Sequence, residues 1–316
     1  MSYARPHDLG IVTSYFNPCG FKVRLANFER FVAPILASGI PLVIVEARFD
    51  DDTSGEGLLP ARYQTVRVQA RDVMWQKERL LDLGTAWLPG HCTKFAWLDA
   101  DILFEDPDWA VATSALLETA VVAQPFSDVV RLSRGFTAPR EGDDSFRSFA
   151  AVYAEDPSIL RHGKFELHGH TGFAWAARRD VFARHGFYDA CIAGSGDHMM
   201  AHTFAGDWES PCIGRIVGRG GRHLAHFRRW SRTIHADIGA RLSCVPGRLL
   251  HLWHGTMENR RYMQRNKELF ELAFDPRADI RISKTGCWEW ASEKPELHAW
   301  ARRYFVERRE DEDASA

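Results

Sequence analysis

Short apolar segments alternate with amphipathic segments through the first hundred residues of the chain. Residues 41–46 and 94–98 are almost entirely apolar, which indicates strands covered on both faces, whereas residues 23–38 have the spacing of an amphipathic helix that ends near Gly39. Strands that alternate with helices form mostly parallel sheets. The expected fold class is therefore α/β, with strands at residues 10–16, 41–46, 65–68 and 94–98, helices at residues 23–38 and 75–83, and an acidic loop at residues 50–57.

The composition excludes several classes of protein. The chain has 316 residues, of which 45% are hydrophobic and 26% charged, so it can bury a core and is neither disordered nor fibrous. Its 40 basic and 42 acidic residues give a net charge of −2, so no overall field attracts it to nucleic acid or to an anionic membrane. The longest apolar run, residues 31–45, is interrupted by prolines and a glycine and is too short to span a bilayer.

The N-terminus and the cysteines indicate the compartment. Residues 1–10 contain no apolar core of a secretory signal, and the six cysteines are scattered without a C-x-x-C pair. Free thiols in a reducing compartment are expected, and the predicted localisation is cytoplasmic. Neither the G-x-G-x-x-G dinucleotide fingerprint nor a P-loop motif is present in the sequence.

Two carboxylates directly follow the apolar segment 94–98. Asp99 and Asp101 are two residues apart, so on an extended chain their side chains point to the same side. Open α/β sheets bind ligands at the carboxyl ends of their strands, and two carboxylates that converge there are unfavourable unless a cation compensates them. The pair therefore predicts a metal site. The alternative is that one carboxylate only caps a turn.

Three later segments carry residues that suit the same chemistry. Residues 169–182 are predicted to form a strand and then a helix. Residues 186–198 contain a glycine-rich turn that delivers Asp197 and His198 at the start of a helix, for which Asp197 could also be the N-cap. His251 and His254 lie three residues apart after two leucines. Carboxylate and imidazole groups together suit Mn²⁺.

Together these segments resemble the nucleotide-sugar-dependent glycosyltransferases of the GT-A fold, close to the family 2-like group and to the catalytic domain of galactosyl- and N-acetylgalactosaminyltransferases. In that family a D-x-D pair binds Mn²⁺ and the donor diphosphate, a G-F-x-x-x-x-x-x-x-G-G-E-D segment contacts the acceptor and supplies the base, and a later histidine completes the metal site. Asp99 with Asp101, residues 186–198, and His251 with His254 match these elements in order, within residues 9–265. The resemblance implies a mostly parallel central sheet flanked by helices, with a smaller acceptor-side region.

The resemblance also implies roles for single residues. Mn²⁺, with Mg²⁺ as the alternative, would be held by Asp99, Asp101, His251 and His254. The nucleotide-sugar donor, for which a UDP-sugar is favoured, would be bound by Thr13, Ser14, Tyr15, Phe16, Glu46, Trp75, Lys77, Asp99 and Gly172. Asp197 is favoured as the base that takes the acceptor proton, with His198 orienting the acceptor or sharing the proton. The register set by Gly186 reverses these two roles, because His198 then aligns with the family's catalytic aspartate.

The predicted function is a metal-dependent, inverting transfer of a sugar from a nucleoside diphosphate to an unidentified acceptor hydroxyl. Two alternatives stay open: a non-catalytic module that binds a nucleotide sugar or a glycan, and a metal-dependent phosphoesterase. The predicted catalytic domain spans residues 1–265, with a nucleotide-sugar half at residues 1–110 and an acceptor-side half at residues 111–265. Residues 266–316 are predicted to form a C-terminal helical extension with a charged tail that is frayed beyond residue 307.

A basic stretch at residues 210–236 bears on the acceptor. It contains no acidic residue, and Phe227 and Trp230 lie among its six arginines, which are Arg215, Arg219, Arg222, Arg228, Arg229 and Arg232. Such a stretch could bind donor phosphates, an anionic glycan or DNA, or it could be a solvated helix face. A polyanionic acceptor therefore stays among the candidates.

Overall fold

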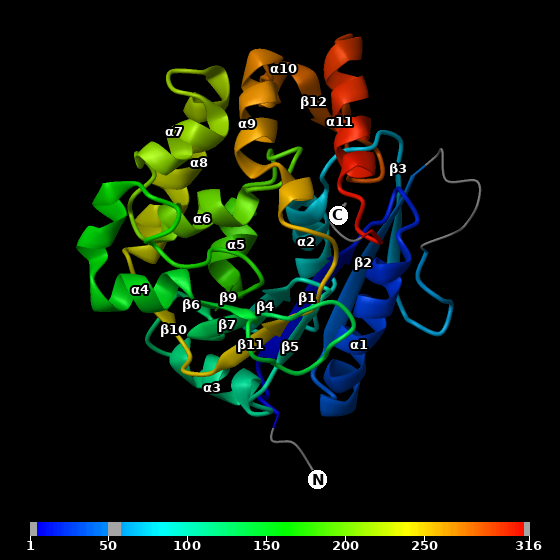
Figure 1. Ribbon diagram of the computed structural model, residues 1–316. Helices are drawn as coiled ribbons and strands as arrows, with labels where there is room; N and C mark the ends of the chain where they lie inside the picture. The colour runs from blue at the N-terminus through cyan, green and yellow to red at the C-terminus, as the bar shows by residue number, and fades with distance from the viewer. Residues whose placement is uncertain (1–4, 50–57, 313–316) are drawn as a thin grey trace.

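A seven-stranded sheet lies at the centre of the computed structural model, which describes residues 5–49 and 58–312 (Figure 1). The strands are β1 (Leu9–Tyr15), β2 (Leu42–Phe49), β3 (Val66–Ala70), β4 (Lys94–Leu98), β6 (Val122–Gln124), β9 (Ala174–Arg178) and β10 (Leu242–Cys244). Their order is β10-β6-β9-β4-β1-β2-β3, and neighbours are parallel except where β9 pairs with β4 and β6. The predicted α/β fold with a mostly parallel sheet is confirmed, and the predicted acidic loop at residues 50–57 lies outside the described residues.

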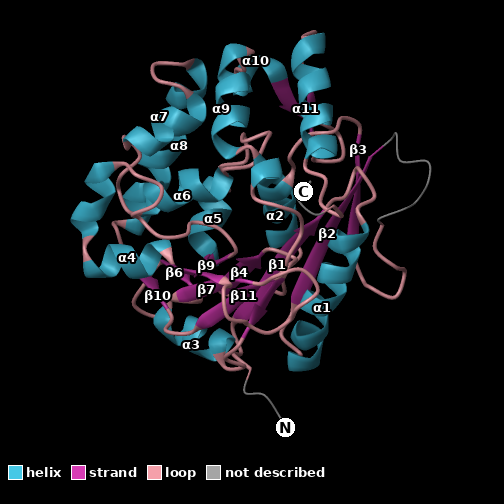
Figure 2. Ribbon diagram, viewed as in Figure 1, coloured by secondary structure: helices cyan, strands magenta, loops and turns pink. Residues whose placement is uncertain are grey.

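Helices cover both faces of this sheet (Figure 2). They include α1 (Lys22–Ser38), α2 (Lys77–Thr85), α3 (Trp109–Leu116), α5 (Arg179–His185), α6 (Gly196–Phe204) and α8 (Arg222–Ile238). Side chains of β4 alternate between the faces: Phe95 and Trp97 pack with residues of α2, α5, α6 and α8, whereas Ala96 and Leu98 pack with residues of α1 and α3. Burial on both faces explains why this strand is apolar.

A smaller sheet determines where the polar residues after β4 lie. It consists of β5 (Ile102–Phe104), β7 (Asp128–Arg131), β8 (Asp144–Arg147) and β11 (Arg248–His251), in the order β5-β11-β7-β8. The antiparallel register of β11 with β5 places His251 opposite Ile102. Because Asp101 directly precedes Ile102, this register brings Asp101 and His251 together.

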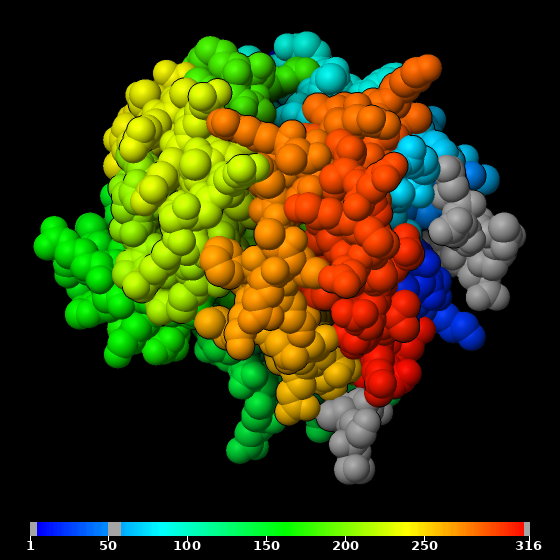
Figure 3. All heavy atoms as spheres, turned by 90° about the horizontal axis from the view of Figure 1, so that it is seen from above, coloured from blue at the N-terminus to red at the C-terminus, as the bar shows by residue number. Residues whose placement is uncertain are grey.

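The C-terminal region lies above the central sheet in the view of Figure 1, and its last described residues contact the start of α1. Its elements are α9 (Tyr262–Glu271), α10 (Pro276–Asp279), β12 (Ile280–Ile282), β13 (Trp288–Trp290) and α11 (Pro295–Glu307). Figure 3 shows α9 and α11, in orange and red, side by side, and the Trp300 indole donates a hydrogen bond to Glu268 between them at 2.8 Å. The prediction that the chain is frayed beyond residue 307 is wrong for residues 308–312, which are the last residues that the structure describes. Glu310 is fully buried, and Asp311 accepts a hydrogen bond from the Lys22 amide at 2.9 Å.

The remaining helical elements in the described part of the chain are α4 (Phe149–Glu155), η1 (Pro157–His162), α7 (Pro211–Val217) and η2 (Glu258–Arg260). No helix among residues 5–49 and 58–312 combines the length and the apolar character needed to cross a bilayer. The prediction of free thiols is confirmed, since all six cysteines are unpaired with one another. The helix predicted at residues 75–83 begins at Lys77, and the Trp75 amide before it donates a hydrogen bond to the Ile192 carbonyl at 2.9 Å.

Candidate active site

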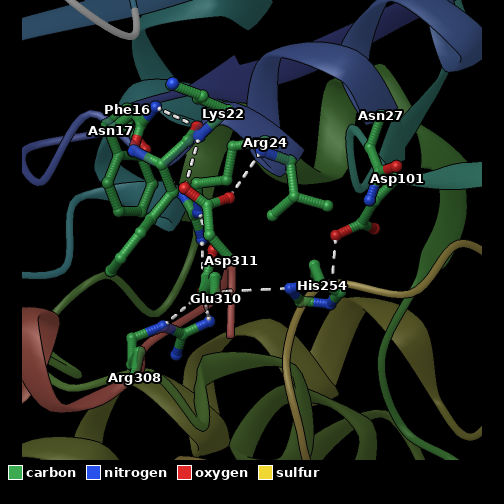
Figure 4. A network of polar contacts seen from close by, with 12 residues as sticks. Phe16, Asn17, Lys22, Arg24, Asn27, Asp101, His254, Arg308, Glu310 and Asp311 are labelled. Atoms are coloured by element: carbon green, nitrogen blue, oxygen red, sulfur yellow. Dashed lines mark hydrogen bonds and ion pairs between the residues drawn. The ribbon is translucent and has the colours of Figure 1, made fainter. Parts of the chain in front are cut away.

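Three side chains of types that can ligate a metal meet beside the carboxyl end of β4. The Leu252 amide donates a hydrogen bond to the Asp101 carbonyl at 2.8 Å, which extends the pairing of β11 with β5. His254 follows, with its Nε2 atom 3.3 Å from Asp101 Oδ2 (Figure 4). The same atom lies 2.9 Å from His251 Nε2. The ligand atoms of Asp101, His251 and His254 all lie within 4.8 Å of one another.

The protonation and the unpaired atoms of this cluster fit a divalent cation. Asp101 Oδ1 is shielded from solvent and has no hydrogen-bond partner among the described residues. Burial, followed by the charge of Asp99, raises the pKa of Asp101. Burial lowers the pKa of His251 well below its usual range and that of His254 to about 3, so both imidazoles are neutral at pH 7 and offer lone pairs. Asp101, His251 and His254 could therefore hold one ion.

Asp99 lies in a second group, centred on Lys77. The Lys77 ammonium, at the start of α2, forms ion pairs with Asp99 and, at 2.7 Å, with Asp197. Burial opposes the charge of Lys77, but the carboxylates of Asp197 and Asp99 outweigh burial and raise its pKa. Within the described chain, Asp99 is not among the residues whose ligand atoms converge on Asp101, so its role as a metal ligand stays a prediction.

Glu78, a buried carboxyl beside Lys77, is not apparent as a site residue from the sequence. Glu78 is 1% exposed, and burial, followed by the charge of Asp197, raises its pKa to about 8. A Cβ atom at residue 196 would overlap its carboxyl group, so Gly196 permits the close packing of α6 on α2. The group thus contains three carboxyls around one ammonium, which favours a protonated Glu78 at pH 7. An acidic residue in the first turn of a helix is too common to indicate such a site from the sequence.

A strained turn positions Asp197. Gly194 and Ser195 have φ angles of 83° and 78°, in the left-handed region that non-glycine residues rarely adopt. Ser195 is the N-cap of α6, so the alternative that Asp197 is the N-cap is wrong. Asp197 Oδ2 accepts a hydrogen bond from Lys77, whereas Asp197 Oδ1 is buried and has no partner in the part of the chain that the structure describes. A bound hydroxyl could donate a hydrogen bond to this oxygen.

His198 belongs to a different group of side chains. Its ring centroid lies 5.0 Å from that of His168 and 4.6 Å from that of His202, and burial lowers its pKa well below the usual range. Adjacent residues on a helix project about 100° apart, so His198 and Asp197 face different surroundings. This geometry does not support the predicted sharing of the acceptor proton by Asp197 and His198, nor the reversal of their roles.

Two residues predicted to bind the nucleoside are engaged within the protein. Thr13 Oγ1 donates a hydrogen bond to the Leu98 carbonyl at 2.8 Å, which ties β1 to β4. Glu46 is fully buried, accepts a hydrogen bond from the Leu59 amide at 2.6 Å and pairs with Arg67 at 3.0 Å. The contacts of Thr13 and Glu46 are therefore structural.

Phe16 and Trp75 instead form an aromatic group with the C-terminal helix. The ring of Phe16 meets that of Trp75 edge to face at 5.1 Å, and Phe305 of α11 stacks on Trp75 at 6.3 Å. Trp75 Nε1 is buried and has no hydrogen-bond partner among residues 5–49 and 58–312. The group joins the loop after β1 to α11.

Three further residues that are predicted to bind the donor, Tyr15, Ser14 and Gly172, lie in different surroundings. Tyr15 is buried against α1, and burial raises the pKa of its hydroxyl to about 12. Ser14 is partly exposed on the opposite face of β1. Gly172 lies close to the candidate base, since a Cβ atom there would be 3.6 Å from Asp197 Oδ2. The structure thus places Gly172 beside Asp197, and Tyr15 in the core.

The C-terminal segment adds a charged cluster that sequence analysis missed. Glu310 forms ion pairs with Arg24 and Arg308, and its Oε1 atom lies 3.8 Å from His254 Nδ1 (Figure 4). Burial opposes the charge of Glu310, but Arg24 and Arg308 outweigh burial and hold its pKa well below the usual range. Arg260 donates a hydrogen bond to the His254 carbonyl at 2.8 Å and lies 3.9 Å from Glu310. The cluster therefore joins three arginines to a candidate metal ligand.

Backbone contacts hold this segment in place. Asp311 accepts hydrogen bonds from the amides of Lys22 and Val23 at the start of α1, at 2.9 and 2.8 Å. Gly255 has a φ angle of 92°, and a Cβ atom there would lie 3.0 Å from Glu310 Cα. Only a residue without a side chain allows that approach at that φ.

Replacing Glu310 with glutamine is expected to lower the free energy of unfolding by about 3 to 5 kcal/mol, because Arg24, Arg260 and Arg308 would lose their buried counter-ion. Urea denaturation measures the change. Glu312→Gln is the matched control, since Glu312 is exposed and 3.9 Å from Arg309, and its cost should stay within about 0.5 kcal/mol. Similar losses in both variants would contradict the ion-pair role of Glu310.

Comparisons with known proteins give no family. No protein-family model matches the sequence, and no curated protein matches it. Among solved structures, the chain is similar to the catalytic domain of Drosophila β1,4-galactosyltransferase 7 in complex with xylobiose, at 10% identity and a TM-score of 0.43, over 94% of this chain and 99% of that one. It is also similar to glucosyl-3-phosphoglycerate synthase from Mycobacterium tuberculosis in complex with Mn²⁺, UDP and phosphoglyceric acid, at 11% identity and a TM-score of 0.42, over 87% and 82% of the chains. These values are too low to assign a family or an activity.

Proposed function

We propose that the chain is a metal-dependent glycosyltransferase that moves a sugar from a nucleoside diphosphate, with UDP favoured, to an acceptor hydroxyl with inversion. The observation that carries the proposal is the convergence of Asp101, His251 and His254 at the carboxyl end of the central sheet. The group of Asp99, Lys77 and Asp197 accompanies it. The order of these elements along the chain is the order that the GT-A resemblance requires.

Each group of residues in the candidate active site has a separate role in the proposed reaction. A divalent ion held by Asp101, His251 and His254 would act as a Lewis acid towards the departing diphosphate. Arg260, beside His254, supplies a guanidinium that can form charge-assisted hydrogen bonds to phosphate oxygens. Asp197 Oδ1 accepts the hydrogen bond of the acceptor hydroxyl and then its proton, while Lys77 keeps Asp197 Oδ2 in place.

The pKa of Asp197 suits a base. Burial raises its pKa, which makes the carboxylate more basic, and the charge of Lys77 opposes this rise. Lys77 thereby favours the ionised form that can take a proton. The net effect is a raised pKa, so the Asp197 carboxylate is a stronger base than an exposed aspartate.

One experiment separates this function from the two alternatives. The protein is incubated with UDP- and GDP-sugars and Mn²⁺, and with simple phosphate esters. Slow release of free sugar from one donor supports the transferase, whereas saturable donor binding without turnover supports a binding module. Phosphate release from the esters supports a phosphoesterase, although enzymes of that class commonly use two metals and the Asp101 cluster has ligands for one.

Mn²⁺ binding is expected to weaken as the pH falls below about 7, because the pKa of Asp101 is raised to about 7 and a metal must displace that proton. The apparent affinity should fall by up to about tenfold for each pH unit. The lowered pKa values of His251 and His254 keep those ligands neutral over this range. Calorimetric titration at several pH values measures the effect, and a pH-independent affinity would contradict it.

The basic stretch supplies a proposal for the acceptor. A hollow of about 500 Å³ is lined by Ala225, Arg228, Arg229, Arg232, Thr233 and Arg277. Arg228 also pairs with the exposed Glu209, so part of this charge is compensated. We propose that an anionic part of the acceptor binds in this hollow.

Neutralising Arg229 and Arg232 together, each to alanine, is expected to raise the acceptor KM by about tenfold, equivalent to about 1.4 kcal/mol, without changing the donor KM. Acceptor binding should also weaken steeply with added salt if the acceptor is a polyanion. Arg281→Ala is the control, because Arg281 is exposed and pairs with Glu289 on the β12–β13 hairpin. Equal increases in both KM values would contradict the proposal.

A further inference from the structure

Four buried side chains outside the candidate active site converge on one point. His168 lies in the loop before β9, His198 and His202 lie on α6, and Cys212 lies in the first turn of α7. His202 and Cys212 are fully buried, and His168 and His198 are 3% and 8% exposed. Their ligand atoms all lie within 4.8 Å of one another.

The three imidazoles each present an unpartnered nitrogen. The Nε2 atoms of His168, His198 and His202 are buried, and none has a hydrogen-bond partner among the described residues. A buried polar atom without a partner raises the free energy of the folded state. Three such atoms in one cluster therefore indicate that a ligand binds there.

The other ring nitrogens determine the tautomers of two histidines. His168 Nδ1 lies 2.8 Å from the Gly169 carbonyl, and His202 Nδ1 lies 2.9 Å from Asp207 Oδ2. Both oxygens are acceptors, so each Nδ1 carries the proton and each Nε2 carries a lone pair. Two lone pairs directed into one buried space require an electron-pair acceptor. A carbonyl or carboxylate behind the imidazole is also the arrangement that orients histidines as metal ligands.

We propose that His168, His198, His202 and Cys212 bind one Zn²⁺ ion in a tetrahedral site, a site separate from the proposed reaction. Three imidazoles and a thiolate are ligands that suit zinc. Zn–N and Zn–S bonds of about 2.1 and 2.3 Å place tetrahedral ligands about 3.5 Å apart. The ligand atoms, now within 4.8 Å of one another, would therefore have to approach one another by up to about 1.3 Å. Binding converts the Cys212 thiol to a thiolate and releases one proton to solvent. Burial raises the pKa of the Cys212 thiol, whereas Arg215 Nη2, 3.8 Å from Cys212 Sγ, favours the thiolate.

All four ligand positions are filled by the protein, so this zinc site is structural. The rings of Phe149 and Phe165 pack against its histidines, at 5.3 Å from His202 and 5.0 Å from His198, and cover the site. The ion would join the loop before β9 to α6 and α7. Since His198 directly follows Asp197, it would also fix the first turn of the helix that carries Asp197.

Elemental analysis and X-ray absorption test the proposal. Protein purified without chelators or a histidine tag is expected to contain one zinc ion per chain, and zinc-edge fine structure is expected to show three nitrogen ligands and one sulfur. After replacement of zinc by Co²⁺, a sulfur-to-cobalt charge-transfer band is expected. Cys212→Ser should remove that band, whereas Cys287→Ser, at another buried cysteine, should keep it. The double variant Asp101→Asn, His254→Ala should also keep the zinc, which separates this site from the Asp101 cluster.

A milder variant covers the case in which Cys212→Ser does not fold. Asp207→Asn keeps every ligand and alters only the partner of His202 Nδ1, so it should fold and lose zinc affinity by about 10- to 100-fold in competition with a chelator. The proposal is overturned if the folded protein neither contains nor takes up zinc. It is also overturned if Cys212→Ser keeps the charge-transfer band, or if Asp207→Asn keeps full affinity.

Discussion

Asp101→Asn is expected to lower the rate of sugar transfer by at least about a thousandfold, with the fold retained. The substitution removes a charged ligand from the cluster of Asp101, His251 and His254, and a Lewis-acidic ion contributes several kcal/mol to the stabilisation of the departing charge. About 4 kcal/mol corresponds to roughly a thousandfold in rate. The measurement is transfer from the active donor at saturating Mn²⁺, together with circular dichroism to confirm folding. His254→Ala should have a similar effect.

Asp180→Asn is the control for this prediction. Asp180 lies on α5, is exposed and pairs with Arg184, so its substitution should leave transfer unchanged. Full transfer activity of the Asp101→Asn protein after treatment with a chelator would contradict the metal-dependent function. The Asp99 and Asp101 carboxylates would then serve only to shape a turn.

Asp197→Asn is expected to lower the rate of transfer by about 10²- to 10⁴-fold while donor binding is retained, because the amide cannot take the acceptor proton. The amide can still accept a hydrogen bond from Lys77, so the first turn of α6 should keep its position. The kcat for transfer and the donor Kd measure the two effects separately. A rate near that of the unaltered protein would exclude Asp197 as the base.

A second variant tests the same residue through its pKa. Lys77 lowers the pKa of Asp197, so Lys77→Met should raise that pKa. The acidic limb of the pH–rate profile should then move to higher pH, because more protons must be removed before Asp197 can act as a base. An unmoved limb would show that another group titrates.

The parts of the molecule that sequence reasoning found depend on local pattern. The wholly apolar β4, with Asp99 and Asp101 after it, reflects burial on both faces and the position of strand ends in α/β sheets. From the sequence, only the order of the GT-A motif elements connects His251 with Asp101, since the register of β11 on β5 is what brings them together. That register depends on residues almost 150 positions apart, as with Arg248 and Glu105, which are separated by 143 residues.

Two parts of the site could not be found in this way. The GT-A resemblance pairs His198 with Asp197, because both fall on its acceptor-contacting segment. Adjacent helical residues diverge, however, and the four-residue spacing of His198 and His202 places those two on one face. That spacing was the available signal. Glu310 had no comparable signal, since a charged segment near a helix end is usually solvated, and its partner Arg24 is 286 residues away.

The pairing of residues 310 and 311 with the start of α1 has a consequence for how the chain matures during synthesis. Domains begin to fold from the N-terminus as the ribosome extends them. The amides of α1 cannot donate their hydrogen bonds to Asp311, nor can Arg24 meet its counter-ion Glu310, until residues 310 and 311 have been translated. The central sheet can therefore form first while Arg24 still lacks its counter-ion. A nascent chain stalled before residue 310 should be compact yet more readily cleaved by protease near residues 16–27 than the released protein.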